Sequence, residues 1–396
     1  MAKDKTYKDM TLAERIKSIQ SQLKVINEQA GVKEGEEPVA FFADSPEAKE
    51  VNEVKFIPTA CTELNECISG KPGTGGYPIG SMTMVIGQAD SGKTARILED
   101  IGKAMQADPN FTALWIESEK SVNNDTLDML HIDRQRFVML TMGPQDGGEV
   151  VLDRAEALLN TGAFNMFVIN SIKALTPKSI INKPISEDTM AVHARMNSKF
   201  CAKFIPLFAA KKIAAVVVQH LSTVIGSYGD PFAMTGGQQL KYLSILQLDF
   251  RKQSVGDGDP IKREEGMKIS VTVKKNHVNT SSFPYGKVTY YVIYGQGTET
   301  KLALLQKGLD NGVLTRAGAY IRFVDKETGE VLSWQGKQAF RNALSDPELY
   351  KKIEDACGGL NEELTQEEIA ELEKEETEEA PAKKTRKKKE DPSDAA

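Results

Sequence analysis

The chain has 396 residues, of which 40% are hydrophobic and 27% are charged, and its formal net charge is −6. This composition provides enough apolar residues for a sizeable core in one large domain or in two to three ordinary ones. No apolar run reaches transmembrane length, and no apolar stretch of the signal-peptide kind follows the charged first residues. These features exclude an integral membrane protein, and we expect a cytoplasmic protein with no membrane partner.

Residues 1–54 are expected to form an N-terminal oligomerisation helix and a linker. Thr11 and Glu14 have the spacing of a capping box at a helix start. Apolar side chains then recur in steps of three and four on one helical face, at Leu12, Ile16, Ile19, Leu23 and Ile26. Two interpretations remain open: this face packs on its own domain, or it docks on a neighbouring subunit, which the acidic stretch 31–44 behind the helix would permit.

A glycine-rich motif follows the expected strand Met82–Ile86. Its eight residues, from Gly87 to Thr94, read G-x-x-x-x-G-K-T, and a helix is expected from Ala95 to Met105. Strand, loop and helix in this order are typical of a phosphate-binding loop, in which backbone N–H groups and the helix N-terminus face phosphate oxygens. Lys93 is expected on the β- and γ-phosphates and the Thr94 hydroxyl on Mg²⁺. The predicted nucleotide-binding residues of this segment are Gly87, Gln88, Ala89, Asp90, Ser91, Gly92, Lys93, Thr94 and Ala95.

Apolar strands alternate with helix-length segments between residues 55 and 300. The expected strands are Met82–Ile86, Ala113–Ile116, Arg136–Leu140, Met166–Ile169, Ala214–Val218 and Ile245–Phe250, followed by a hairpin of Met267–Lys275 and Lys287–Tyr294. The alternation predicts an α/β domain with a doubly wound, mostly parallel sheet. A small C-terminal domain is expected at 301–360, with helices Leu302–Leu314 and Asp346–Cys357. The acidic and then basic tail, 361–396, is expected to be disordered.

Polar residues follow two of these strands. Glu119 comes after Ala113–Ile116, and Asn170 and Ser171 come after Met166–Ile169. Because the carboxyl ends of parallel strands meet at one edge of a sheet, both sets are expected beside the phosphate loop. A carboxylate there can polarise a water molecule that attacks the γ-phosphate, so Glu119 is the candidate general base.

Two glycine- and polar-rich segments, 181–189 and 222–237, each follow an expected strand of the core, and both are too long for tight turns. Long loops inside a compact domain are commonly functional or disordered, so a ligand-free interpretation stays open for both. Gly236 and Gly237 come directly before an expected helix, and their N–H groups are therefore candidates for binding a nucleic-acid phosphate.

With these motifs in this order, the sequence resembles the RecA family of homologous recombinases (RecA- and UvsX-like proteins), and the resemblance is compatible with a phage-encoded member. The resemblance covers roughly Phe56 to Cys357. The matching segments, in unbroken order, are Gly87–Thr94, Trp115–Glu119, Val168–Ser171, Ala174–Lys178, Ala194–Met196, Val216–Gln219, Thr235–Gly237, Leu240–Tyr242, Val273–Asn276 and Tyr294–Gly297. The fold it implies is a RecA-type ATPase core.

The resemblance also implies residue roles. Glu119 and Lys93 are catalytic, together with Gln219, which senses the γ-phosphate, and Lys275, which reaches across a subunit boundary to the neighbour's ATP. The implied DNA-binding residues are the wedges Met190 and Val224, the phosphate contact Arg195, and Ser198, Gly236 and Gly237.

Three departures from the family pattern stand out. Asn170 replaces a usual aspartate of the Mg²⁺ shell, which predicts weaker Mg²⁺ retention or slower hydrolysis. His277 replaces a second cross-subunit lysine. Asn123 and Thr126 replace the usual acidic and aromatic adenine contacts.

The leading hypothesis is an ATP- and Mg²⁺-dependent recombinase. It would form a homo-oligomeric helical filament on single-stranded DNA, and would then pair that strand with homologous double-stranded DNA in recombination and repair. A single-strand-binding or mediator protein is a further expected partner. The alternatives are a ring-forming helicase or motor with the same core, and an ATP-gated DNA-binding protein with little hydrolysis.

Overall fold

The structure is a computed structural model of the chain. It describes residues 10–32, 38–46, 48, 53–181, 192–223, 232–234, 238–256, 259–279, 286–325 and 328–358. The chain divides into two compact units, Met1–Ala303 and Leu304–Ala396. Within the described ranges no helix is both long and apolar enough to cross a bilayer.

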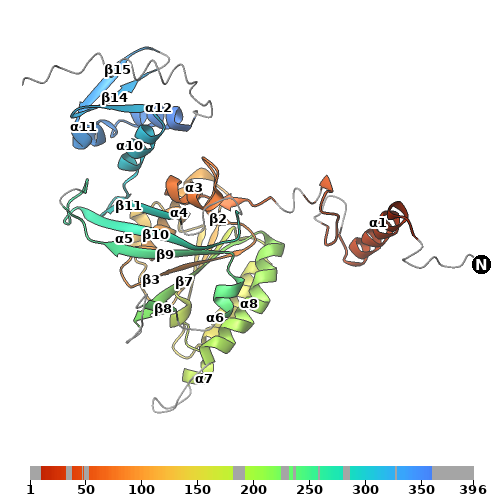
Figure 1. Cartoon of the computed structure of the whole chain (residues 1–396). Coiled ribbons are helices and arrows are strands. Elements are labelled where there is room, and N and C mark those ends of the chain that lie inside the picture. Colours follow the sequence, from red (N-terminus) through yellow and green to blue (C-terminus); the bar gives the residue numbers. More distant parts are fainter. Residues whose placement is uncertain are drawn as a thin grey trace, which may run out of the picture. The chain divides into compact units, whose positions relative to one another are not determined.

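The first unit is built on a large central sheet (Figure 1). Among the described residues the sheet has ten strands: β3 (Met82–Gly87), β4 (Ala113–Glu117), β5 (Phe137–Thr141), β6 (Met166–Asn170), β7 (Ala214–Thr223), β8 (Phe232–Met234), β9 (Leu246–Gln253), β10 (Gly266–Asn276), β11 (Lys287–Ile293) and β12 (Gly297–Thr298). Their order is β12-β11-β10-β9-β3-β7-β6-β4-β5, and β8 pairs with β7. The run from β9 to β5 is parallel, and the strands from β9 to β12 pair antiparallel. The expected doubly wound, mostly parallel α/β sheet is therefore confirmed.

Helices cover both faces of this sheet (Figure 1). They are α3 (Thr62–Ser69), α4 (Lys93–Ala107), α5 (Asn124–Met129), α6 (Gly148–Asn160), the 3₁₀ turn η2 (Ile172–Ala174), α7 (Lys178–Ile181), α8 (Val192–Lys211) and α9 (Gln239–Leu243). A two-stranded sheet of β1 (Phe56–Ile57) and β2 (Tyr77–Pro78) precedes β3.

Two apolar cores result from the alternation of side chains along the buried strands. In β6, Val168 packs into the cluster that includes residues of α3 and α4, while Phe167 and Ile169 pack into the cluster that includes residues of α6 and α8. All three side chains are fully buried. Successive residues of a strand point to opposite faces, so a continuous apolar run marks a strand that is covered on both sides.

A charged network is buried inside the first core. The guanidinium of Arg96 on α4 is 3.4 Å from Asp100 Oδ1, and it lies over the Tyr290 ring, 4.4 Å from its centroid. Asp100 also accepts hydrogen bonds from the Ala60 N–H (2.6 Å) and the Tyr77 hydroxyl (2.8 Å). Burial raises the pKa of Asp100 to about 6, against the lowering effect of Arg96. The network ties α4, which carries the phosphate loop, to the strands around it.

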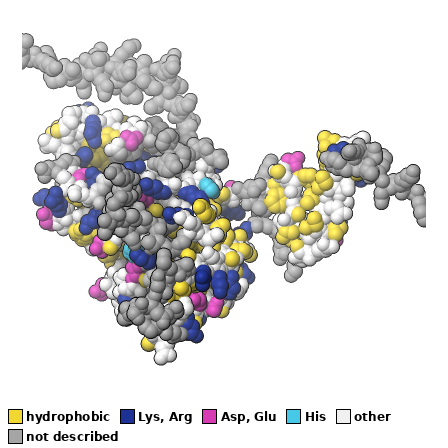
Figure 2. Space-filling model, turned by 60° about the horizontal axis from the view of Figure 1, so that its bottom comes forward, with side chains coloured by type: hydrophobic (Ala, Val, Ile, Leu, Met, Phe, Trp, Pro, Cys, Tyr) yellow, Lys and Arg dark blue, Asp and Glu magenta, His cyan; other side chains and the backbone are white. Residues whose placement is uncertain are grey.

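The N-terminal helix α1 spans Leu12–Gln29, with the expected capping box of Thr11 and Glu14. None of its residues is buried. Leu12 is 73% exposed and Ile19 is 46% exposed, and Figure 2 shows hydrophobic side chains gathered over this part of the chain, at the right of the view. The Asn27 side chain bonds the backbone at 39–40: Oδ1 accepts from the Val39 and Ala40 N–H groups, and Nδ2 donates to the Ala40 carbonyl oxygen. These bonds bury none of the apolar face.

The second unit begins within α10 (Thr300–Asp310) and holds the antiparallel sheet β13 (Leu314–Ala317), β14 (Tyr320–Val324) and β15 (Val331–Gln335), followed by α11 (Gly336–Ala343) and α12 (Pro347–Gly358). The predicted helix Leu302–Leu314 is wrong at its C-terminal end. Gly312 has a φ of +69°, and a glycine in the left-handed conformation ends a helix, so Leu314 starts a strand instead. The tail at 361–396 lies outside the described residues.

Candidate nucleotide and DNA site

The phosphate loop joins the end of β3 to the start of α4, and glycine is required at both glycine positions of the motif. A Cβ on Gly87 would lie 2.4 Å from the carbonyl oxygen of Phe250 in the neighbouring strand β9. Gly92 has a φ of +82° and is the N-cap of α4, and a Cβ there would lie 2.3 Å from Ile269 Cδ1. Because this N-cap is a glycine, no cap side chain accepts a hydrogen bond from the first turn of α4. The N-terminal N–H groups of this 15-residue helix therefore fit an anionic ligand.

Lys93 lies inside this loop and is only 4% exposed. Its ammonium donates to the carbonyl oxygens of Gly87 (3.2 Å) and Gln88 (2.5 Å) and to Ser91 Oγ (3.2 Å). Burial lowers the pKa of Lys93 to about 8, although the Glu119 carboxylate acts in the opposite direction. An anionic ligand beside a buried ammonium favours its charged form, and this loop geometry fits the phosphate group of a ligand.

Thr94 and Asn170 meet where Mg²⁺ is expected. Thr94 Oγ1, at the start of α4, donates a hydrogen bond to Asn170 Oδ1 at the end of β6, at 3.2 Å. In the described part of the chain no three His, Cys, Asp or Glu side chains gather in a way that would hold a metal alone. Mg²⁺ prefers oxygen ligands and keeps several waters and phosphate oxygens, so one hydroxyl and one amide oxygen fit it.

Glu119 follows β4, and its carboxylate is already engaged. Its Oε1 lies 2.8 Å from His220 Nε2 and also accepts a hydrogen bond from Ser171 Oγ. The side chains of Glu119 and His220 are both 26% exposed. The hydrogen bond from His220 is the largest cause of a lowered pKa of Glu119, and partial burial opposes it.

A second carboxylate, Glu117, lies behind this site, and sequence reasoning assigned it no role. Glu117 is 4% exposed. Its Oε1 accepts from the N–H groups of Glu119 and Ser121, at 3.0 and 3.1 Å, and its Oε2 accepts from Trp115 Nε1 at 2.8 Å and Asn170 Nδ2 at 3.3 Å. Its position in the sequence could have indicated this role, because Glu117 is the last residue of a buried strand and a buried carboxylate needs hydrogen-bond donors around it.

Gln219 belongs to β7, which lies between β3 and β6 in the sheet. We expected this strand to end at Val218, but it continues to Thr223. In the β3–β7 register, Gln219 pairs with Ile86 and His220 with Gly87. Gln219 is 1% exposed. The strand that leads to residues 224–231 therefore runs directly beside the phosphate loop.

Lys275 and His277 lie toward the end of the strands that is opposite the phosphate loop. Lys275 pairs with Gln247 of β9, which in turn pairs with Met84 near the start of β3. The Lys275 ammonium donates to the carbonyl oxygens of Lys241 (3.0 Å) and Tyr242 (2.8 Å). His277 is exposed. Neither residue lies beside the phosphate loop of its own chain.

Asn123 and Thr126 bond to each other. The Asn123 side chain caps α5 by accepting from the Thr126 N–H at 2.8 Å. Of the predicted DNA-binding residues, Arg195 is exposed on the first turn of α8, and Ser198 Oγ donates to the Ala194 carbonyl oxygen at 2.8 Å. The others, Met190, Val224, Gly236 and Gly237, lie outside the described residues.

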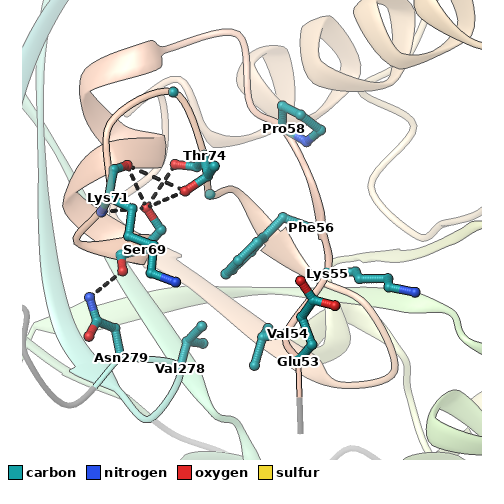
Figure 3. A pocket seen from close by; sticks show the side chains of 12 residues that line it. Glu53, Val54, Lys55, Phe56, Pro58, Ser69, Lys71, Thr74, Val278 and Asn279 are labelled. Atoms are coloured by element: carbon teal, nitrogen blue, oxygen red, sulfur yellow. Dashed lines mark hydrogen bonds between the residues drawn. The ribbon is translucent and has the colours of Figure 1, made fainter. Parts of the chain in front are cut away.

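A separate cavity of about 630 Å³ lies away from this site (Figure 3). It is lined by residues 53–56 and Pro58, by the turn that contains Ser69 and Thr74, and by Val278 with Asn279. The turn is closed by hydrogen bonds, among them Ser69 Oγ to the Thr74 carbonyl oxygen at 2.8 Å. No residue of the phosphate loop lines the cavity, so it is distinct from the nucleotide site.

Comparison with known proteins agrees with this architecture. The model of the RecA N-terminal domain family matches residues 17–299. The chain belongs to the RecA family. It is 29% identical over 310 residues to Protein RecA of Cutibacterium acnes, covering 78% of this chain and 83% of that protein. It is 29% identical to Protein RecA of Streptomyces coelicolor, covering 76% of each chain, and 27% identical to Protein RecA of Bacteroides thetaiotaomicron, covering 87% of this chain and 97% of that protein. The resemblance seen in the sequence is thereby confirmed for the RecA core.

Proposed function

We propose that this RecA-family protein is an ATP-dependent recombinase that assembles on single-stranded DNA and pairs it with homologous duplex DNA in recombination and repair. One observation carries the proposal. Strand β7 runs beside the phosphate loop, places His220 on the candidate base Glu119, and leads directly into the segment predicted to bind DNA. A single strand would therefore connect the proposed nucleotide site to the proposed DNA-binding segment, as coupled binding requires.

ATP with Mg²⁺ is the proposed cofactor. Lys93 and the start of α4 would bind the phosphates, and Thr94 with Asn170 would hold Mg²⁺, which neutralises phosphate charge when bound. Glu119 would orient and deprotonate the attacking water once its carboxylate is released from His220. Gln219, buried beside Ile86, would report the presence of the γ-phosphate to the rest of β7.

Assembly is proposed to complete the site. Lys275 lies toward the end of the strands opposite its own phosphate loop, which supports a role at the nucleotide of another subunit. The exposed apolar face of α1 is proposed to dock on a neighbour, a head-to-tail contact of the kind that generates open helices. Arg195 is proposed to contact the DNA backbone, and a charge of this kind supports binding without sequence preference.

The test combines turnover, assembly and pairing. Wild-type protein should hydrolyse ATP faster with single-stranded DNA, form filaments in electron micrographs, and produce joint molecules between a single strand and a homologous duplex. Glu119→Gln should still bind ATP and form filaments, but its rate of ATP hydrolysis should fall by about 10²- to 10⁴-fold, the usual contribution of a general base to the rate. Closed rings with directional unwinding, or DNA affinity that is the same with and without ATP, would contradict the proposal.

A further inference from the structure

The Asn170 amide lies between the Thr94 hydroxyl on one side and the Glu117 carboxylate and the Ser121 hydroxyl on the other. On one side Oδ1 accepts from Thr94 Oγ1 at 3.2 Å. On the other side Nδ2 donates to Glu117 Oε2 at 3.3 Å and to Ser121 Oγ at 3.0 Å. Asn170 is fully buried, so no water replaces a partner that is lost.

The Glu117 carboxylate determines which way this amide faces. An ionised carboxylate accepts hydrogen bonds and donates none, so only the NH₂ group of Asn170 can face it. The amide oxygen must then point toward Thr94, where Mg²⁺ is expected. Glu117 itself is fixed by Trp115 Nε1 and by the N–H groups of Glu119 and Ser121, and it therefore acts as a rigid reference.

Resting on the nucleotide function proposed above, we propose that Glu117 is a positioning residue for the Mg²⁺ site, and that Glu117 and Asn170 form one charge-matched unit. The carboxylate stands at position 117, and the amide at 170 presents an oxygen to the metal. Exchanging the two groups should preserve the unit, whereas changing either alone should break it. An aspartate at 170 would place acceptor against acceptor in a buried site, and a glutamine at 117 would let the Asn170 amide turn its NH₂ group toward Thr94.

The experiment is a double-mutant cycle of Glu117→Gln, Asn170→Asp and the exchanged pair. Asn165→Asp is the matched control, because Asn165 is exposed on the same segment and its Oδ1 accepts from the Thr112 N–H, away from Glu117. The first readout is thermal unfolding of the nucleotide-free protein. We expect Asn170→Asp to lower the Tm by about 4 °C or more, the control to lower it less, and the exchanged pair to recover part of the loss. Recovery should be incomplete, because Trp115 Nε1 loses its acceptor.

The second readout is the Mg²⁺ concentration that gives half-maximal binding of a fluorescent ATP analogue, which needs no hydrolysis. Glu117→Gln should raise it about 10- to 100-fold, the usual cost of losing the partner of a metal ligand, and the exchanged pair should bring it back toward wild type. Equal Mg²⁺ requirements for wild type and Glu117→Gln, or additive Tm losses across the cycle, would overturn the inference. Failure of the wild type itself to bind the analogue would instead overturn the proposed function.

If Glu117→Gln does not fold, the comparison of Asn170→Asp with Asn165→Asp decides. A Tm for Asn170→Asp equal to that of the control would show that the carboxylate of Glu117 does not constrain position 170. Folding of the exchanged pair where the single variant fails would support the unit directly.

Discussion

Replacing His220 by leucine removes the donor that lies 2.8 Å from Glu119 Oε1. The acceptor is a carboxylate oxygen, so Nε2 must carry the hydrogen of this bond. A hydrogen bond to a charged group contributes about 1.5–3 kcal/mol, which corresponds to about a 10- to 100-fold change in the fraction of molecules with a released Glu119. His220→Leu should therefore raise the ATPase rate without DNA by about tenfold or more, and should reduce the further stimulation by single-stranded DNA.

His220→Gln is the matched control, since glutamine retains an N–H donor at the end of its side chain and should keep the DNA-free rate low. The double variant His220→Leu with Glu119→Gln should be inactive, because the extra turnover has to pass through Glu119. The pH profile gives an independent check. The hydrogen bond from His220 is the largest cause of the lowered pKa of Glu119, so His220→Leu should raise that pKa. The acidic limb of the pH profile of ATP hydrolysis should then move to higher pH.

The assay is steady-state phosphate release with and without a single-stranded oligonucleotide, at saturating ATP. An unchanged DNA-free rate in His220→Leu would refute the reasoning, as would an equal increase in His220→Gln. The first result would mean that the bond does not limit access to Glu119. The second would mean that the imidazole matters for its shape and not for its donor.

Other expectations concern stability, assembly and the subunit boundary. Burial raises the pKa of Asp100 from 3.8 to about 6, so the folded state holds an extra proton in this range and the stability due to Asp100 falls as pH rises through it. Urea unfolding of Asp100→Asn should lack this fall, which amounts to at most about 3 kcal/mol, and a difference from wild type that does not vary with pH would contradict it. Leu12→Asp and Ile19→Asp should abolish filaments seen by electron microscopy while leaving the Tm within about 1 °C, because both side chains are exposed; retained filaments would exclude α1 from assembly. Lys275→Ala and Glu119→Gln should each be inactive in ATP hydrolysis but active when mixed, because a mixed interface combines an intact lysine with an intact glutamate. A mixture without activity would place Lys275 outside the neighbour's site.

Local sequence was sufficient to predict the elements that have strong local signals. The glycine-rich motif after β3 could be recognised because only glycine fits at Gly87 and Gly92, and the capping box of α1 satisfies its own backbone groups within one turn. The buried strands were predictable because a strand covered on both faces is apolar at every position. Boundaries that depend on a single backbone angle were less certain, as Gly312 shows by ending α10 before Leu314.

Contacts between distant segments were decided by the tertiary structure alone. The sequence predicted that Glu119 and Asn170 share an edge, but not that Glu117, 53 residues before Asn170, holds its amide. It gave no sign that His220 contacts Glu119, 101 residues away in the sequence. A motif can be recognised in the sequence when its residues interact within a few positions of one another. The partner of a buried carboxylate depends instead on strand order and register, which only the folded sheet specifies.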